Sequence, residues 1–410
     1  MSDTTPPNDR SWMDRKLEET GRRLQSPEGR KQLVGGCLRL VQRVVSGTTV
    51  TYVLALLLLG ALMRYVGERN MFFAFCLYLP PLLWYLPALV LLPLCLLVGA
   101  WRTLLVSCLC VALSVSVFFG YKLGSHEPVA TVAPPTRLVV LTNNRGQNAG
   151  QSLKPFKNLV KPDVMVFQEA GGTASRYLAD PAYGEFKDGR DVAGEFSLVS
   201  RYPIVSGDPV TLTVAAVPRS VYEPTTATET YTIAARYVLD VNGTHVVVYN
   251  VHMPTPRDTL RYYQRGVFLY GLIGLPGTPF AAKRVANQKG WDQRIELVLK
   301  LLERARQETG PTLLVGDFNM PSTGWSYQQV LKDFAEAHAE AGSGFGFTFP
   351  GVTRNPLSFG GAWMRIDHLF FDREHWYCHQ GITEPDRASQ HRAAAVVLDL
   401  KASTQFKAAP

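Results

Sequence analysis

Cysteine is nearly absent from the C-terminal two thirds of this 410-residue sequence. Beyond residue 110 the only cysteine is Cys378, and the chain contains no C-x-x-C pair. A single cysteine cannot form an internal disulfide, and structural zinc sites are usually built from paired cysteines or histidines. We therefore expect this part of the chain to fold without disulfide bonds or a cysteine-based zinc centre, and the redox state of its compartment stays open.

A surplus of positive charge is also missing from residues 124–410, which hold 29 basic and 27 acidic side chains. The formal net charge of +8 arises mostly nearer the N-terminus, because residues 1–70 contain 11 basic and 7 acidic side chains. A broad nucleic-acid surface usually needs clustered lysine and arginine. The charge balance therefore disfavours extended nucleic-acid binding by the larger C-terminal part.

Formal charge is absent from residues 71–100, and two further apolar runs cover residues 48–66 and 103–121. About 20 consecutive apolar residues are enough to cross a bilayer. The sequence therefore predicts three transmembrane helices within residues 48–123, after a basic segment, 1–47. The four prolines of the middle run predict a kinked span there, with a re-entrant pair of helices as the alternative.

The flanking charges predict how these helices are oriented. Basic residues are concentrated before the first apolar run, and Arg102 lies in the short turn before the third. Positive charge tends to stay on the cytoplasmic side of a membrane. We therefore expect an integral membrane protein with a cytoplasmic N-terminus, the lipid bilayer as partner of its three helices, and the rest of the chain outside the cytoplasm.

After a short linker, 124–136, the sequence changes to β-rich runs typical of a folded domain, which we expect to span residues 137–403 and to leave a tail, 404–410. Asn242-Gly243 lies between two such runs and is a strong signal for a two-residue hairpin. Apolar residues recur at helical spacing over residues 291–305, which predicts an amphipathic helix. Many strands with few helices predict an α/β fold in which two sheets pack face to face with helices outside.

Polar side chains recur where the predicted strands end. Six segments share this feature: Asn143-Asn144, Gln168-Glu169, Asn250 with His252, Asp317 with Asn319, Asp367-His368, and His391. Asp and Asn are common turn formers, so any single case has a simple structural explanation. Six in succession favour a functional site, because strand ends hold side chains more accurately than surface loops do.

At these segments the sequence resembles the endonuclease/exonuclease/phosphatase superfamily, the DNase I-like group of metal-dependent phosphoesterases. The matching stretches follow the family's order over residues 137–400: "VLTNN", "VMVFQEA", "LVSRYPI", "YNVHMPTPRD", "LLVGDFNMPS", "RIDHLFF" and "SQHRAAAV". The resemblance implies a four-layer DNase I-like sandwich of two β-sheets flanked by helices, here preceded by the all-helical transmembrane region. It also implies a hydrolase, namely a Mg²⁺-dependent phosphodiesterase or endonuclease-like enzyme, with Mn²⁺ as an alternative cofactor.

The chemistry of phosphodiester hydrolysis suits these residue types. It needs a hard cation near a non-bridging oxygen, a deprotonated water and relief of charge on the leaving oxygen, and hard cations prefer oxygen ligands. The resemblance implies these roles: Glu169 is the principal metal ligand with Asn144 beside it, Asp317 orients or deprotonates the water, Asn319 holds the water or the phosphate, His391 donates to the phosphoryl or leaving oxygen, Asp367 fixes the His391 ring, His252 faces the phosphate, and Glu195 orients His252.

The chain departs from the family's pattern at Gln390, where the last motif usually carries aspartate between serine and histidine. Glutamine keeps the length and an acceptor oxygen but removes one negative charge. Two hypotheses follow: an active enzyme with weaker or single-metal binding, or a noncatalytic, membrane-anchored scaffold that binds a phosphorylated ligand. We favour the enzyme, because the other positions match the family.

The insertion 261–290 bears on the substrate. It combines basic side chains with an apolar run, which predicts either contact with lipid headgroups or packing on the domain itself. Lipid contact would favour a phospholipid headgroup or lipid-linked phosphate as substrate. A basic rim of Arg257, Arg261 and Arg265 would favour a short nucleic-acid strand instead. The sequence therefore predicts a phosphodiester substrate and leaves nucleic acid and phospholipid as alternatives.

Overall fold

Two compact units make up the chain. The computed structural model describes residues 12–124, 137–146, 152–217, 227–257, 260, 279–352, 361–385 and 387–401. One unit combines Met1–Leu58 with Leu82–Leu113, and the other combines Leu59–Pro81 with Ser114–Pro410. Residues 59–81 therefore pack with the long C-terminal part of the chain.

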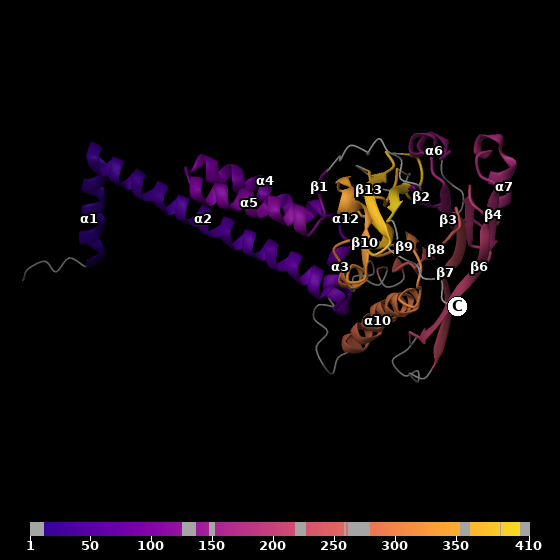
Figure 1. The fold of residues 1–410 in the computed structure, drawn as a ribbon. Helices are drawn as coiled ribbons and strands as arrows, with labels where there is room; N and C mark the ends of the chain where they lie inside the picture. Colours follow the sequence, from indigo (N-terminus) through magenta and orange to yellow (C-terminus); the bar gives the residue numbers. More distant parts are fainter. Residues whose placement is uncertain are drawn as a thin grey trace, which may run out of the picture. The chain divides into compact units, whose positions relative to one another are not determined.

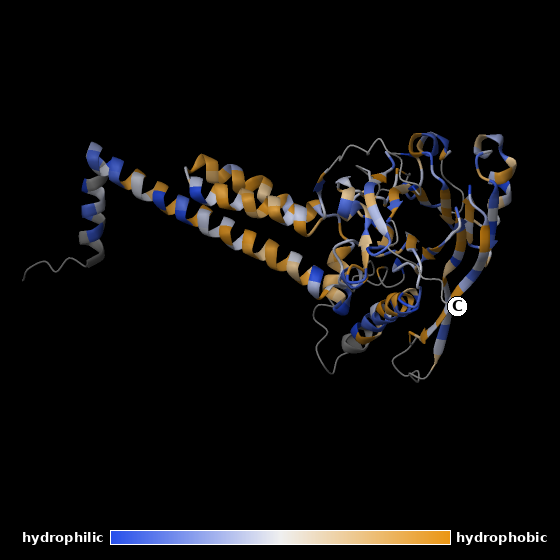
Figure 2. Cartoon of the chain, viewed as in Figure 1, coloured by the Kyte–Doolittle hydropathy of each residue, from blue (hydrophilic) through white to orange (hydrophobic). Residues whose placement is uncertain are grey.

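Apolar helices dominate the first unit (Figure 2). The helices of the N-terminal region are α1 (Trp12–Gln25), α2 (Pro27–Tyr65), α4 (Leu82–Leu97) and α5 (Trp101–Val117), and the ends of α2 and α5 continue into the second unit. The hydroxyl of Tyr52 on α2 donates to Trp84 O on α4 over 2.9 Å. Most leucines and valines of these helices are exposed on the protein surface, as expected of helices that face lipid or a partner.

The prediction of three full-length membrane spans is wrong. Among the described helices, α2 alone is long and apolar enough to cross a membrane by itself. The second predicted span is broken into α3 (Met71–Leu77) and α4, bent by 76°, because Pro80 and Pro81 cannot continue a helix. The third is the 17-residue helix α5, shorter than the about 20 residues that span a bilayer. The bent pair adds a second candidate only if it is counted as one span.

Two six-stranded mixed β-sheets form the frame of the second unit (Figure 1). The strand orders are β13-β14-β2-β3-β5-β4 and β10-β12-β9-β8-β7-β6. In the first sheet the strands are β2 (Arg137–Asn144), β3 (Val164–Gln168), β4 (Asp188–Val192), β5 (Phe196–Ser200), β13 (Trp376–Thr383) and β14 (Ala394–Leu400). In the second they are β6 (Ile204–Ala215), β7 (Thr228–Val241), β8 (Thr244–His252), β9 (Thr312–Asp317), β10 (Phe334–Glu336) and β12 (Asp367–Asp372). The pairs β2/β3 and β8/β9 are parallel.

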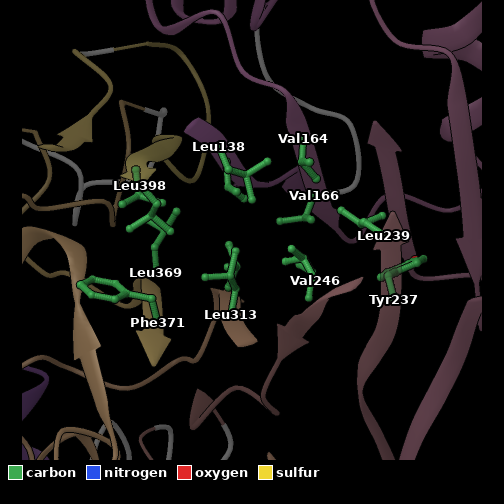
Figure 3. Packing of buried hydrophobic residues seen from close by; sticks show 14 of the residues in the cluster. Leu138, Val164, Val166, Tyr237, Leu239, Val246, Leu313, Leu369, Phe371 and Leu398 are labelled. Carbon is green, nitrogen blue, oxygen red and sulfur yellow. The ribbon is translucent and has the colours of Figure 1, made fainter. Parts of the chain in front are cut away.

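Apolar side chains from both sheets fill the space between them (Figure 3). Leu138 and Val166 come from one sheet, and Val246 and Leu313 come from the other. Burial of this apolar surface is what holds the sheets face to face, at about 25 cal/mol per Å² removed from water.

Helices cover the outer face of each sheet. The remaining elements of this unit are η1 (Gly67–Arg69), α6 (Lys154–Val160), α7 (Ala174–Ala179), η3 (Pro181–Tyr183), α10 (Pro279–Ala305), α11 (Trp325–Val330), α12 (Ala337–Ala341) and the paired short strands β1 (Lys122–Leu123) and β11 (Ser343–Gly344). Phe156 of α6 and Tyr177 of α7 pack on the first sheet. Leu301 of α10 and Val330 of α11 pack on the second. The expected four-layer sandwich of two sheets flanked by helices is therefore confirmed.

Local predictions also hold within this frame. Asn242 and Gly243 connect β7 to β8 with φ values of 54° and 87°, the left-handed pair that a two-residue hairpin needs. The helix predicted over residues 291–305 lies within α10, and Trp291 is buried. Most of the predicted linker (125–136), most of the insertion (261–278) and the tail 404–410 lie outside the described residues.

Candidate active site

The predicted site residues lie on the facing sides of the two sheets, at one end of the sandwich. Side chains alternate between the two faces of a strand. Asn144 therefore faces the other sheet, as Val140 does, and Asp317 does so on β9, as Val315 does. The site is thus the polar end of the core between the sheets.

Strand register brings the second sheet's contributions together. β8 runs parallel to β9 with His252 opposite Asp317. β12 runs antiparallel to β9 on its other side, with Asp367 opposite Asp317. Three neighbouring strands therefore deliver these three side chains to one edge.

Buried amides join the two sheets just below the site. The side-chain nitrogen of Gln168 donates to Asn250 Oδ1 over 2.6 Å, and Asn250 donates to Phe167 O over 2.9 Å. Gly316 lies against this pair, because a Cβ there would approach Gln168 Nε2 to 2.9 Å. Strand β9 continues through Gly316 to Asp317. The absence of a side chain at Gly316 leaves room for Gln168 and for the neighbouring strand β8.

Asn144 connects two carboxylates. Its Nδ2 donates to Asp317 Oδ2 over 2.9 Å and to Glu169 Oε1 over 3.2 Å. Its Oδ1 accepts from the backbone of Gly146 over 2.8 Å. Glu169 follows β3 with a left-handed φ of 50°, a conformation that few residues other than glycine adopt without support. The amide thus holds carboxylates from different sheets near each other.

Asp317 is buried and tightly held. Asn319 N donates to its Oδ1 over 2.8 Å, and Asn319 Nδ2 donates to Met253 O over 2.9 Å. Burial, and to a smaller extent the charge of Asp367, raise the pKa of Asp317. A raised pKa makes this carboxylate a stronger base than an exposed aspartate.

His391 and Asp367 form a buried pair. His391 Nδ1 donates to Asp367 Oδ2 over 3.0 Å. Burial by itself lowers the pKa of His391, but the charges of Asp367 and Asp317 outweigh it and raise the pKa to about 9. The ring is therefore an imidazolium at neutral pH, with Nε2–H free of the Asp367 bond and able to donate.

His252 is held by Glu195, whose Oε1 contacts its Nδ1. The other ring nitrogen, Nε2, lies 3.9 Å from Glu169 Oε1. Burial lowers the pKa of His252, but the hydrogen bond to Glu195 and the charge of Asp317 outweigh it, so that the pKa is raised.

One oxygen lies between the two imidazoles. Asp317 Oδ2 is 3.8 Å from His252 Nε2 and 3.8 Å from His391 Nε2. These distances are too long for direct hydrogen bonds, and a separation of this size suits an intervening water or substrate oxygen. The arrangement can therefore place a carboxylate base and two donors around one small polar group.

The donor set fits a hard divalent cation. Among the described residues, ligand atoms of Asp317, Asp367 and His391 lie within 4.8 Å of one another and could hold a metal ion. His391 is already hydrogen-bonded to Asp367 through Nδ1, and hard cations prefer oxygen ligands to imidazole. Glu169 is the better candidate, since its side chain is 31% exposed and the hydrogen bond from Asn144 engages only its Oε1.

Gln390 is exposed at the rim of the site. A Cβ on Gly146 would lie 3.3 Å from Gln390 Oε1, so this side chain reaches the turn that follows Asn144. The position at which the sequence departs from the pattern it resembles is thus next to Asn144 and Glu169.

Two sets of supporting contacts were not predicted from the sequence. Tyr78 and Arg294 both donate to Asn319 O, over 2.7 and 2.8 Å. Tyr78 lies within an apolar run and Arg294 on the polar side of an amphipathic pattern, so neither carries a local signal. Arg387 donates to Glu384 Oε1 over 2.8 Å and to the backbone of His391 over 3.4 Å. Glu384 and Arg387 are three residues apart in "EPDRASQH", and this spacing of opposite charges was a signal that they would pair and hold the loop before His391.

A family model described as "Endonuclease/Exonuclease/phosphatase family" matches residues 143–391, more than half of the chain. Comparison with curated protein sequences gives no significant match. Similar solved structures include TDP2 from C. elegans, with 16% identity over 70% of this chain and 84% of that chain and a TM-score of 0.41. An endonuclease/exonuclease/phosphatase from Beutenbergia cavernae has 18% identity over 65% and 72%, with a TM-score of 0.39. The human Nocturnin catalytic domain with bound sulfate has 12% identity over 66% and 97%, with a TM-score of 0.39.

Proposed function

This chain belongs to the endonuclease/exonuclease/phosphatase family, and we propose that it is a membrane-anchored, divalent-metal-dependent phosphoesterase that hydrolyses a phosphodiester by in-line attack of water. The position of Asp317 Oδ2, 3.8 Å from the Nε2 atoms of both His252 and His391, supports this most directly. In a protein that only bound phosphate, the two imidazoles would strengthen binding, but the buried carboxylate of Asp317 beside them would repel the anion and weaken it. A carboxylate at that position suits proton removal from water.

The proposed reaction uses one base and one acid. Asp317 removes a proton from water while the water oxygen forms a bond to phosphorus. The bond between phosphorus and the leaving oxygen breaks, and His391 gives its Nε2 proton to that oxygen. Asp367 remains hydrogen-bonded to Nδ1 and stabilises the imidazolium before the transfer. The products are a phosphate monoester and an alcohol.

Two further side chains would hold the phosphoryl group. His252, oriented by Glu195, would donate from Nε2 to a non-bridging oxygen. Asn319 would hold the attacking water beside Asp317, because its backbone and side chain are already fixed there. Donors that are positioned before the reaction stabilise the charge that develops on the phosphoryl oxygens.

Glu169, with Asn144 beside it, is the proposed holder of Mg²⁺ or Mn²⁺. When bound, the cation supplies positive charge next to a non-bridging phosphate oxygen. The side chains of Asp317 and Asp367 are 1% and 0% exposed and engaged by hydrogen bonds, and Glu195 is bound to His252, which favours Glu169 as the carboxylate that can reach an ion.

The apolar half of α2 is the proposed membrane anchor. Residues 59–81 and 114–410 belong to one unit, so they lie on the same side of any bilayer. The chain enters α4 from this unit and comes back to the same unit at the end of α5. These two helices therefore do not change the side of the membrane on which the site lies. One crossing by α2, preceded by basic residues that favour a cytoplasmic N-terminus, would put the site outside the cytoplasm.

Purified full-length protein in detergent tests the proposal with a bis-aryl phosphodiester and Mg²⁺ or Mn²⁺. We expect hydrolysis that EDTA abolishes and that Asp317→Ala and His391→Ala reduce by about 100-fold or more. Asp208→Ala and His245→Ala remove exposed residues of the same kinds and should leave the rate unchanged. Folded protein without turnover, or turnover that survives EDTA, would contradict the enzyme. A panel of single-stranded DNA, RNA and phospholipid vesicles then separates the two substrate classes.

A further inference from the structure

The loop that carries Asp317 and Asn319 packs against residues far away in the sequence. Asn319 O accepts a hydrogen bond of 2.7 Å from Tyr78, a residue 241 positions earlier. Tyr78 follows α3, the short helix between the end of α2 and the start of α4. Both residues belong to the same compact unit. A segment that lies between two apolar helices is therefore in direct contact with the catalytic motif.

The contact around Tyr78 is built from several elements. The ring of Tyr78 lies 5.5 Å from that of Trp291 on α10, which also packs on Met71 and Ala74 of α3. Arg294, one turn further along α10, donates to the same Asn319 oxygen over 2.8 Å. Tyr78 therefore lies in a fixed position, with its hydroxyl directed at the loop.

Close steric fit joins the same segment to the end of the loop. Glu68 Oε2 accepts from Ser326 N over 3.2 Å. A Cβ on Gly324 would overlap the Glu68 carboxylate, and a Cβ on Gly67 would lie 2.6 Å from Trp325 N. Real Cβ atoms do not approach backbone so closely, so glycine is needed at position 67, and a side chain at position 324 would displace the Glu68 carboxylate from Ser326. This degree of fit indicates a permanent contact that forms with the fold.

Asn319 needs this support because its backbone is strained. Its φ of 46° is left-handed, which costs a non-glycine residue energy unless its surroundings hold it. Its N–H and side chain are bound to Asp317 and Met253. The carbonyl is the remaining backbone polar group of Asn319, and Tyr78 and Arg294 both donate to it.

We propose that Tyr78 is a positioning residue for the Asp317–Asn319 loop, so that the segment 66–81, which connects α2 to α4, completes the active site. The proposal rests on the proposed function, because the loop it positions is the one that would remove the proton from water. Tyr78 does not touch the substrate. It acts through the Asn319 peptide group, whose displacement by a fraction of an ångström would misalign both Asn319 and Asp317.

The test compares Tyr78→Phe with wild type in the full-length protein. Phenylalanine keeps the ring against Trp291 and removes only the hydroxyl donor. We expect kcat for the bis-aryl phosphodiester to fall about 10- to 100-fold with little change in KM. In an Asn319→Ala background the same substitution should lower kcat by a smaller factor than in wild type, because the part of the effect that passes through the Asn319 side chain is already lost and only the effect on Asp317 is left.

Tyr249→Phe is the matched control, since it also removes a buried hydroxyl, one that donates to Glu308 over 2.6 Å outside the site. Both variants should lose a few degrees of Tm, whereas only Tyr78→Phe should lose kcat. A loss of kcat in both, or in neither, would overturn the positioning role.

Amide hydrogen exchange gives a readout that does not depend on turnover. Tyr78→Phe should speed exchange at Asn319 N–H, which donates to Asp317, by about tenfold, and Tyr249→Phe should not. Unchanged exchange in Tyr78→Phe contradicts the proposal even if the enzyme is active. A wild-type protein that hydrolyses nothing would instead refute the proposed function, and the exchange result would still decide whether Tyr78 fixes the loop.

Discussion

Asp317 and Asp367 face each other across the antiparallel strands β9 and β12, and His391 reaches both. Its Nδ1 lies 3.0 Å from Asp367 Oδ2 and its Nε2 lies 3.8 Å from Asp317 Oδ2. Burial raises the pKa of Asp317, and repulsion between its carboxylate and that of Asp367 raises it further. The two carboxylates also stabilise one imidazolium between them. Strand register thus brings together the proposed base, Asp317, and the proposed acid, His391, with Asp367 holding the imidazole ring.

Asp317→Asn should remove activity and keep the fold. The amide cannot accept the proton from water, so we expect kcat to fall by about 10²- to 10⁴-fold. Both carboxylate oxygens accept hydrogen bonds from buried donors, and asparagine can accept at only one of the two positions, so we expect a loss of about 1–3 kcal/mol that leaves the protein folded. Steady-state kinetics and thermal unfolding measure the two effects. A variant with more than a tenth of wild-type kcat would exclude Asp317 as the base.

The pH profile should report His391. Its folded pKa of about 9 lies above the ordinary value of 6.5, so the proton is held more tightly in the folded state. The resulting stability is fully present below pH 6.5 and is lost as pH rises through about 9. The donor is lost over the same upper range, and kcat should fall above pH 9.

Asp367→Asn tests the cause of the fall in kcat at high pH. It removes the carboxylate whose charge does most to raise the pKa of His391, so the fall in kcat should begin at a lower pH. Profiles of kcat from pH 6 to 10 for both proteins make the comparison. An upper limb that does not move in Asp367→Asn would mean that another group controls it.

Gln390→Asp should strengthen metal binding. The side chain lies at the turn that follows Asn144, and a carboxylate there would add negative charge near the proposed ligand Glu169. We expect half-maximal activity at about tenfold lower Mg²⁺, because each 1.4 kcal/mol of added attraction changes affinity tenfold. Gln307→Asp makes the same charge change at an exposed position and controls for net charge. Equal Mg²⁺ dependence in wild type and Gln390→Asp would mean that the glutamine does not weaken the site.

Gly324→Ala should destabilise the protein. Its Cβ would overlap the buried carboxylate of Glu68, and such overpacking costs about 1–3 kcal/mol. Gly310→Ala is the control, because its Cβ would make an ordinary contact of 3.4 Å with His245 O. Chemical denaturation compares the two free energies of unfolding.

Removing the Glu68 side chain should make room for the new methyl group. The double variant Glu68→Ala/Gly324→Ala should therefore lose less stability than the sum of the two single variants. Additive losses would show that Glu68 and Gly324 are not in contact in solution.

Local sequence patterns were sufficient to predict the sandwich and the polar residues at its strand ends, whose roles are proposals. Residues such as Asn144, Asp317 and Asp367 terminate or begin strands that are short, largely buried apolar runs, and the hairpin at Asn242-Gly243 is encoded by two adjacent residues. The number of membrane spans could not be obtained in this way. Hydrophobicity counts residues 71–77 as part of a span, whereas Met71 and Ala74 are buried against Trp291 of the folded domain.

The sequence by itself determined which chemical groups stand at the strand ends, because a short apolar run and the polar residue beside it are properties of neighbouring positions. Only the tertiary structure decided that Asp317 Oδ2 lies between two imidazoles and that Tyr78 holds the Asn319 carbonyl. Those relationships join side chains from different sheets, or residues 241 positions apart. They depend on register and close packing, which no local spacing along the chain encodes.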